Sequence, residues 1–249
     1  MIKHYCIHEV SGYIDWIYFF HAWGFSPSKI QTPEAIQLLQ EAKDMLKQLE
    51  QDFQTHAVLR IIDANSEEND IWIEGTRFPL LRQQTAKEEE PYLCLSDFIR
   101  PASSKVKDKI GLFATTVDAG MEQLYTEDPY LHMLVKTLAD RLAEATAEKM
   151  HDTIRQEFPG IRPAIGYPSL PDQSVNFLLD ELLDMKQIGI HLTENGMMQP
   201  HASVSGLIFA HPASRYFSVG KIDEQQLKDY AIRRGVPVEQ MRKFLARNL

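Results

Sequence analysis

The residues with the clearest chemical potential lie in a proline-rich stretch, GIRPAIGYPSLPD at positions 160–172, which carries the cation Arg162 and the phenol Tyr167. Each proline fixes its own backbone angle and removes an N–H group, so this stretch cannot be the interior of a helix or a central strand. We expect a stiff, extended loop whose backbone groups lack ladder partners, and a bound ligand is one way to satisfy them. An ordinary rigid connector is the alternative, and composition alone favours it.

A second candidate is Asp15, the one carboxylate in the aromatic-rich run YIDWIYFFHAWGF at positions 13–25. If this carboxylate is buried, it needs a hydrogen-bond or ion-pair partner, because an isolated buried charge is very costly. An aspartate just before an apolar run also suits the N-cap of a helix. The sequence leaves a ligand role and a capping role open.

Other polar side chains give weaker indications. Glu144 and Glu148 lie one turn apart on a predicted helix, where paired carboxylates usually belong to a solvated face. His4 and His8 lie in a strand-like segment, where a spacing of four does not build a metal-binding face. The 2 cysteines lack a CxxC spacing, so we expect neither a disulfide nor a zinc site.

Composition excludes several classes of protein. The net charge of −9 and the lack of a basic stripe argue against binding to nucleic acid. No stretch approaches the roughly 20 apolar residues of a membrane span, and the N-terminal segment does not resemble a signal peptide. The P-loop, GxGxxG, HExxH and GxSxG motifs are all absent. A protein of the reducing cytoplasm fits these observations best.

The elements that must position these residues follow from apolar spacing and turn signals. Helical periodicity predicts a helix from Thr32 as cap to Phe53, a long helix from Pro129 to Phe158, and short helices at 175–183, 223–234 and 238–246. A short strand or an extended lead-in is predicted at 1–10, and strands at 57–64, 71–74, 91–99, 109–117 and 188–194. A hairpin of 203–210 and 215–222 and a polar loop or helical turn at 81–90 complete the prediction. This mixture without βαβ alternation predicts a single α+β domain, 1–249, with a largely antiparallel sheet.

The residues also carry a family resemblance. The loop at 160–172 resembles the R-x-x-x-G-Y-P signature of the activation (reactivation) domain of cobalamin-dependent methionine synthase. Further matches follow in that family's order: YIDW and FFHAW near the N-terminus, LRQQ at 81–84, LSDFIRP at 95–101, LADRLAEA at 138–145, SVSGLIFAHPASRYFSVGKI and DYAIRRG. Several motifs in the correct order over nearly the full chain are far more specific than one short match.

The resemblance implies a fold and a function. The family's domain is a C-shaped α+β fold with a twisted antiparallel sheet and flanking helices, without a Rossmann core, and it binds S-adenosylmethionine in a shallow groove. It supports the repair of oxidised cob(II)alamin, in which flavodoxin or an equivalent reductant supplies an electron and S-adenosylmethionine supplies a methyl group. Site residues carried over by motif are Asp15, Glu144, Arg162, Ala164, Tyr167, Tyr216 and Phe217.

Each carried-over residue has a role that its chemistry allows. Asp15 can pair with the ligand's ammonium, and Arg162 can form a forked pair with its carboxylate. The backbone of Ala164 is expected to face the adenine, Tyr216 to line the nucleoside pocket, and Glu144 to favour the sulfonium. Phe217 replaces a family tyrosine, so no hydroxyl is available there.

Other features depart from the family. Gln173 to Asn176 replace a His-Thr-Glu-Lys run, and the connection at 158–161 is shorter. The sequence has neither a D-x-H-x-x-G cobalamin motif nor a cysteine cluster. We therefore expect a stand-alone reactivation subunit that is inactive alone and docks onto a cobalamin-binding methionine synthase chain. A non-catalytic S-adenosylmethionine sensor or scaffold is the alternative.

Overall fold

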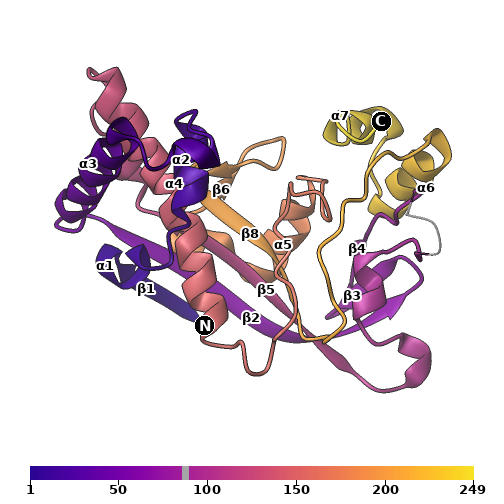
Figure 1. Ribbon diagram of the computed structural model, residues 1–249. Helices are drawn as coiled ribbons and strands as arrows, with labels where there is room; N and C mark the ends of the chain where they lie inside the picture. The colour runs from indigo at the N-terminus through magenta and orange to yellow at the C-terminus, as the bar shows by residue number, and fades with distance from the viewer. Residues whose placement is uncertain (86–89) are drawn as a thin grey trace.

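An antiparallel sheet organises the protein in the computed structural model, which describes residues 1–85 and 90–249 (Figure 1). Within these residues the main sheet has six strands in the order β4-β3-β2-β5-β8, with β1 paired to one end of β2. Its strands are β1 (Ile2–Cys6), β2 (Gln54–Glu67), β3 (Asp70–Ile73), β4 (Thr76–Pro79), β5 (Asp108–Val117) and β8 (Ser203–Phe209). A small second sheet pairs β6 (His191–Leu192) with β7 (Met198–Gln199). The α+β class with an antiparallel sheet is confirmed.

The centre of the sheet is the pairing of β2 with β5, whose register runs from Thr55 opposite Val117 to Ala64 opposite Asp108. Alternate residues of β5 point to opposite faces, as strand geometry requires. Phe113 packs into the apolar cluster on one face and Leu112 into the cluster on the other, and both side chains are fully buried. Burying each such side chain contributes about 1.5–3 kcal/mol, so the sheet must be covered on both faces.

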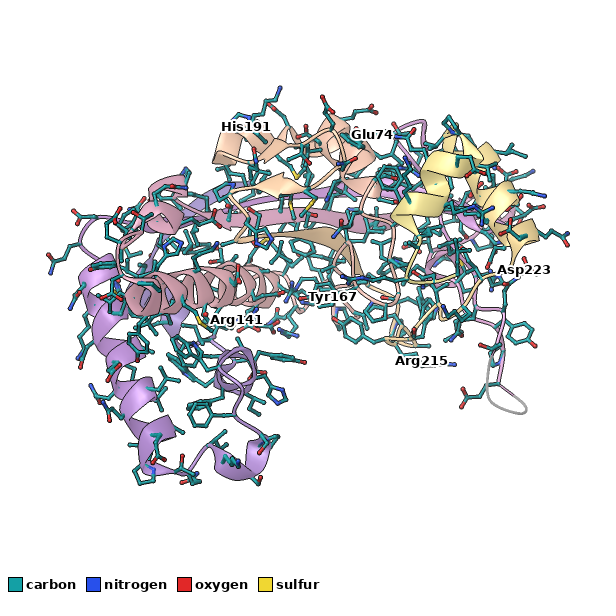
Figure 2. The ribbon with its side chains drawn as sticks, turned by 90° about the horizontal axis from the view of Figure 1, so that it is seen from above. Glu74, Arg141, Tyr167, His191, Arg215 and Asp223 are labelled. Atoms are coloured by element: carbon teal, nitrogen blue, oxygen red, sulfur yellow. The ribbon has the colours of Figure 1, made fainter. Side chains whose placement is uncertain are left out.

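Helices cover these two faces and both ends of the sheet. They are α1 (Ile7–Ser11), α2 (Trp16–Ala22), α3 (Pro33–Leu49), α4 (Pro129–Asp152), α5 (Val175–Leu183), α6 (Glu224–Arg234) and α7 (Val238–Phe244). In Figure 1, α1 to α4 gather at one end of the molecule and α6 and α7 at the other. Seen from above, the molecule bends around an open side, and Arg141 and Tyr167 lie along its inner edge (Figure 2). This shape agrees with the predicted C-shaped domain.

Local signals set the helix starts. The Thr32 hydroxyl accepts the N–H of Ala35 at 3.4 Å, and the Asp128 carboxylate accepts the N–H groups of Tyr130 and Leu131. Such caps satisfy N–H groups that have no partner within the helix.

No helix among residues 1–85 and 90–249 combines the length and apolar composition that a membrane span requires.

The long helix α4 ends at Asp152, so the prediction that it continues to Phe158 is wrong. The chain turns back here, and the buried His151 donates from Nε2 to the Phe158 carbonyl at 2.9 Å. The turn delivers Gly160 against β8, where a Cβ atom would lie 2.3 Å from the Phe209 carbonyl oxygen. A continued helix could not make this close approach. The helix at 33–53 likewise ends early, at Leu49.

Several strand predictions are wrong. Segment 91–99 forms a 3₁₀ helix, Leu95–Phe98, and Asp97 holds its start by accepting the N–H of Cys94 at 2.8 Å. The first strand ends at Cys6, and only two residues of 188–194, those of β6, are extended. In the polar segment 81–90, residues 81–85 and 90 lie outside helices and strands, and 86–89 lie outside the described residues.

The predicted hairpin of 203–210 with 215–222 does not form, because the proline loop occupies the outer edge of β8. The N–H groups of Leu207 and Phe209 donate to the carbonyls of Pro163 and Ile161, at 3.1 and 2.9 Å. The N–H of Ile165 donates to Ser205 at 2.8 Å. The loop therefore has ladder partners after all, and the return segment runs on without a strand.

Candidate functional site

The sequence-predicted site residues meet in one groove of about 860 Å³. Four parts of the chain form the walls of the groove. They are α4, the N-terminal part of α2 with the residues just before it, the proline loop and the segment after β8. The groove is lined by Tyr13, Asp15, Tyr18, Arg141, Glu144, Glu148, Arg162, Pro163, Ala164, Tyr167, Pro168, Ser169, Tyr216 and Phe217. A volume of this size suits a small-molecule ligand.

Arg162 is held rigidly at this groove. Its side chain is only 11% exposed, its guanidinium lies over the Phe113 ring at 5.2 Å, and Nη2 pairs with Glu148 at 3.1 Å. Its Nε is buried without a hydrogen-bond partner among the described residues. A buried N–H group left unpaired is costly.

Glu148 bridges two arginines while its side chain remains 42% exposed, so it lies on a partly solvated helix face and also forms ion pairs. Its second oxygen accepts from Arg155 at 2.5 Å. Partial burial opposes ionisation, but the hydrogen bonds and charges of Arg162 and Arg155 lower the pKa of Glu148 below its usual value. Glu148 is therefore an anion that positions Arg162.

Glu144 lies one turn before Glu148 and lines the groove, where the family resemblance places it. The Tyr167 hydroxyl donates to its Oε1 at 2.6 Å. Burial and the charge of Glu144 raise the pKa of Tyr167, so the phenol stays protonated. The pair places a fixed negative charge beside the proline loop.

Asp15 fills one of its two proposed roles directly. Its Oδ1 accepts the N–H of Ile17 at 2.9 Å and caps α2. Its Oδ2 has no hydrogen-bond partner within residues 1–85 and 90–249, and the side chain lines the groove. The capping role is confirmed, and one carboxylate oxygen remains available to a cation.

The backbone at Ala164 is shaped by close contact with β8. Ala164 lies opposite Gly206, where a Cβ atom would come within 2.2 Å of the Pro163 carbonyl oxygen, so only glycine fits. The neighbours Pro163 and Ile165 make the hydrogen bonds to β8. The N–H of Ala164 takes part in no hydrogen bond between described residues.

Two aromatic residues after β8 complete the groove. Tyr216 is 64% exposed, and its hydroxyl oxygen accepts the backbone N–H of Arg162 at 3.1 Å. Phe217 is half-buried, and its ring centroid lies 6.5 Å from that of Phe98. Tyr216 thus fixes the loop backbone while its ring stays exposed at the groove.

Sequence analysis did not assign four of the groove residues to the site: Tyr13, Tyr18, Arg141 and Glu148. Glu148 was named there only as part of a helix face. Arg141 lies over the Tyr18 ring at 5.9 Å. The spacing of Arg141, Glu144 and Glu148 puts all three on one helix face, and this polar stripe was the available signal.

Comparison with known proteins gives concordant matches. The family model described as "Vitamin B12 dependent methionine synthase, activation domain" matches residues 6–235. The crystal structure of the MetH reactivation domain bound to AdoHcy superposes with a TM-score of 0.91 at 35% sequence identity. The match covers 100% of this chain and 90% of that chain. The sequence resemblance and the fold expected from it are confirmed.

Proposed function

This chain belongs to the activation-domain family of vitamin B12-dependent methionine synthase, and from that premise we propose that its groove binds S-adenosylmethionine for the reactivation of cobalamin. The family and a similar structure with bound AdoHcy support this function. AdoHcy is what remains of S-adenosylmethionine when its methyl group has been transferred.

The observation that carries the proposal is the meeting of Asp15, Glu144 and Arg162 at one groove. S-adenosylmethionine presents an ammonium, a carboxylate, a sulfonium and an adenine. One cationic and two anionic side chains match the charged groups of such a ligand, and charge-assisted pairs are the stronger hydrogen bonds. The guanidinium of Arg162, whose side chain is 11% exposed and lines the groove, provides the cation for the ligand carboxylate.

Each residue then has a distinct role in this proposal. Arg162 binds the carboxylate, Asp15 the ammonium, and Glu144 lies near the sulfonium. The N–H of Ala164 serves the adenine edge, and the ring of Tyr216 lines the nucleoside pocket. Because the loop is paired to β8 before ligand binds, little conformational entropy is lost on association.

The reaction supported by this groove is a reductive methylation. One electron reduces cob(II)alamin, and the methyl group of S-adenosylmethionine then passes to cobalt and leaves AdoHcy. This chain's part is to bind and orient the methyl donor, and a cobalamin-binding module of methionine synthase presents the cobalt. We propose flavodoxin or an equivalent protein as the reductant. Because the chain carries a net charge of −9, an acidic reductant would need a local basic patch.

Isothermal titration calorimetry with S-adenosylmethionine tests the binding step. We expect one site per chain in the wild type and at least a tenfold loss of affinity in Arg162→Ala, because the carboxylate loses its charged partner. Arg215→Ala is the matched control, since Arg215 is exposed and does not line the groove. Equal affinity in the wild type and Arg162→Ala would contradict the assignment.

A further inference from the structure

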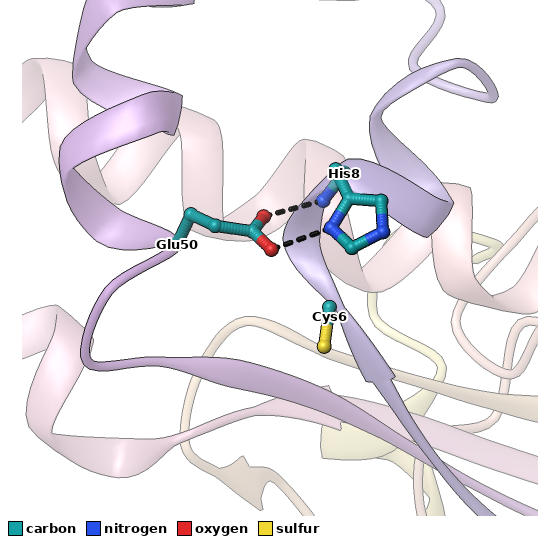
Figure 3. Close-up of side chains that lie close together, drawn as sticks. All are labelled: Cys6, His8 and Glu50. Atoms are coloured by element: carbon teal, nitrogen blue, oxygen red, sulfur yellow. Dashed lines mark hydrogen bonds and ion pairs between the residues drawn. The ribbon is translucent and has the colours of Figure 1, made fainter.

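A cluster of potential metal ligands lies where β1 ends and α1 begins (Figure 3). The Sγ of Cys6, an imidazole nitrogen of His8 and a carboxylate oxygen of Glu50 all lie within 4.8 Å of one another. Sequence analysis expects no metal here, because His4 and His8 lie in a strand-like segment and the cysteines lack a CxxC spacing, and it does not consider Glu50, which is 42 residues from His8. The fold brings the three side chains together, and none of them lines the groove.

The backbone holds these side chains in place. Cys6 is the last residue of β1, pairs with Gln54 of β2, and donates its N–H to the Glu9 carboxylate at 2.9 Å. Glu50 follows α3 directly, and its N–H donates to the Leu46 carbonyl at 3.0 Å. The chain direction at both positions is thus set by regular structure, so the cluster does not depend on a long loop.

The contact between His8 and Glu50 marks the centre of the cluster. Oε2 of Glu50 accepts the backbone N–H of His8 at 2.6 Å, and Oε1 lies 2.6 Å from Nδ1 of the imidazole. Nδ1 of His8 and Oε1 of Glu50 each carry an electron pair, and the proton between them holds the two atoms close together. A divalent cation can replace that proton and use the same two donors, with the imidazole proton on Nε2.

The chemistry of the donors selects the kind of metal. A thiolate, an imidazole and a carboxylate are ligands of Zn²⁺, with bonds of about 2.0–2.3 Å in a tetrahedral arrangement. Such bonds place ligand atoms roughly 3.3–3.6 Å apart, by the same geometry. The cluster needs only small side-chain movements to reach this spacing. The side chain of His8 is 71% exposed, so a water molecule can take the fourth position.

We propose that Cys6, His8 and Glu50 form a binding site for one Zn²⁺ ion with water as the fourth ligand. On binding, the Cys6 thiol and Nδ1 of His8 each release a proton to solvent, Nε2 carries the remaining imidazole proton, and the ion bonds to sulfur, Nδ1 and a carboxylate oxygen. The ion links the β1–α1 junction to the end of α3 and stabilises the folded chain. This site is independent of the S-adenosylmethionine groove.

A histidine pair nearby offers a matched control. Nδ1 of His4 lies 2.7 Å from Nδ1 of His56, which is its cross-strand partner on β2. The other ring nitrogen of His56 lies 2.8 Å from the Asp118 carboxylate. An ion at the surface could bind to this histidine pair instead of the cluster. Only binding at the histidine pair should be weakened by His4→Gln.

The test uses the full chain, stripped of metal by a chelator and titrated with Zn²⁺ by calorimetry and with Co²⁺ by absorption spectroscopy. We expect one ion per chain, a thiolate-to-cobalt charge-transfer band, and a higher melting temperature with Zn²⁺. Cys6→Ser, His8→Gln and Glu50→Gln should each weaken Zn²⁺ binding at least tenfold, and His4→Gln should leave it unchanged.

Three results would overturn the proposal. One is the absence of stoichiometric Zn²⁺ binding by the wild type. Another is wild-type affinity in Cys6→Ser, or a loss confined to His4→Gln, which would move the ion to the histidine pair. The third is a bound Co²⁺ ion without the thiolate band. This measurement uses the wild-type chain, so it does not depend on the folding of a variant.

Discussion

Glu148 of α4 and Arg162 of the proline loop form an ion pair, with 3.1 Å between Oε2 and Nη2. The pair joins two segments that lie on opposite sides of the turn after α4. Arg155 binds the other oxygen of Glu148, so the carboxylate is held from both sides. The guanidinium of Arg162 is therefore positioned before any ligand enters the groove.

This ion pair predicts an acid dependence of stability. Because the folded-state pKa of Glu148 is lowered, its contribution to stability is complete above the unfolded pKa of 4.5. It is lost as the pH falls through the folded value. Chemical unfolding of Glu148→Gln should show about 1 kcal/mol less stability at neutral pH, a value kept small because the side chain of Glu148 is 42% exposed. Between roughly pH 6 and pH 3 the difference should shrink. A constant difference across this range would contradict the assignment.

Glu144 should distinguish a charged ligand from a neutral one. If its carboxylate lies near the sulfonium, Glu144→Gln weakens binding of S-adenosylmethionine about tenfold, or about 1.4 kcal/mol. Binding of AdoHcy, whose thioether is neutral, should change little. Calorimetry with both ligands measures the ratio. An equal loss for the two ligands would show that Glu144 acts on shape or on Tyr167 rather than on charge.

Asp15 carries two separable roles. Asp15→Asn keeps an oxygen that can accept the N–H of Ile17, but it removes the charge proposed to bind the ammonium. We expect Asp15→Asn to keep its melting temperature and lose affinity for S-adenosylmethionine. Asp15→Ala should lose both, with about 1 kcal/mol of stability from the missing cap. Unchanged affinity in Asp15→Asn would leave Asp15 as a cap alone.

Gly206 tests the packing of the loop on β8. In Gly206→Ala the new methyl group would lie 2.2 Å from the Pro163 carbonyl oxygen, so the loop must move. We expect a loss of about 1–3 kcal/mol in stability together with weaker ligand binding. Gly12→Ala is the control, because a Cβ atom there meets nothing within 4 Å. If Gly206→Ala binds S-adenosylmethionine as the wild type does, the loop position is not what forms the groove.

The sequence predicts the local part of this structure well. The helix α3 begins at its predicted cap, Thr32, and α6 begins one residue after its predicted start at Asp223, because helix starts depend on neighbours within a few residues. The central strand β5 is also found where its apolar run predicts it. The failures concern partners distant in sequence. The segment after β8 has strand-like composition, but Pro163 and its neighbours already occupy that edge.

In the groove, too, the local features are predicted from the sequence, and the contacts between distant segments are not. Motif resemblance places Asp15, Glu144, Arg162 and Tyr216 at one site, and the fold brings them together. The role of Glu148 depends on a turn that carries the chain from Asp152 to Arg162, and helical spacing alone does not reveal that turn. The cluster of Cys6, His8 and Glu50 depends likewise on the docking of α3 beside α1.

The central claim is tested most directly by the absorption spectrum of cobalamin. The full chain is mixed with the cognate cobalamin-binding chain in the cob(II)alamin state, a reductant and S-adenosylmethionine. Arg162→Ala and a sample without S-adenosylmethionine serve as controls. We predict conversion to methylcobalamin with the wild-type chain and a strongly slowed conversion with Arg162→Ala. If the wild-type chain binds S-adenosylmethionine but cob(II)alamin persists, the chain is a sensor or scaffold and the reactivation function is contradicted.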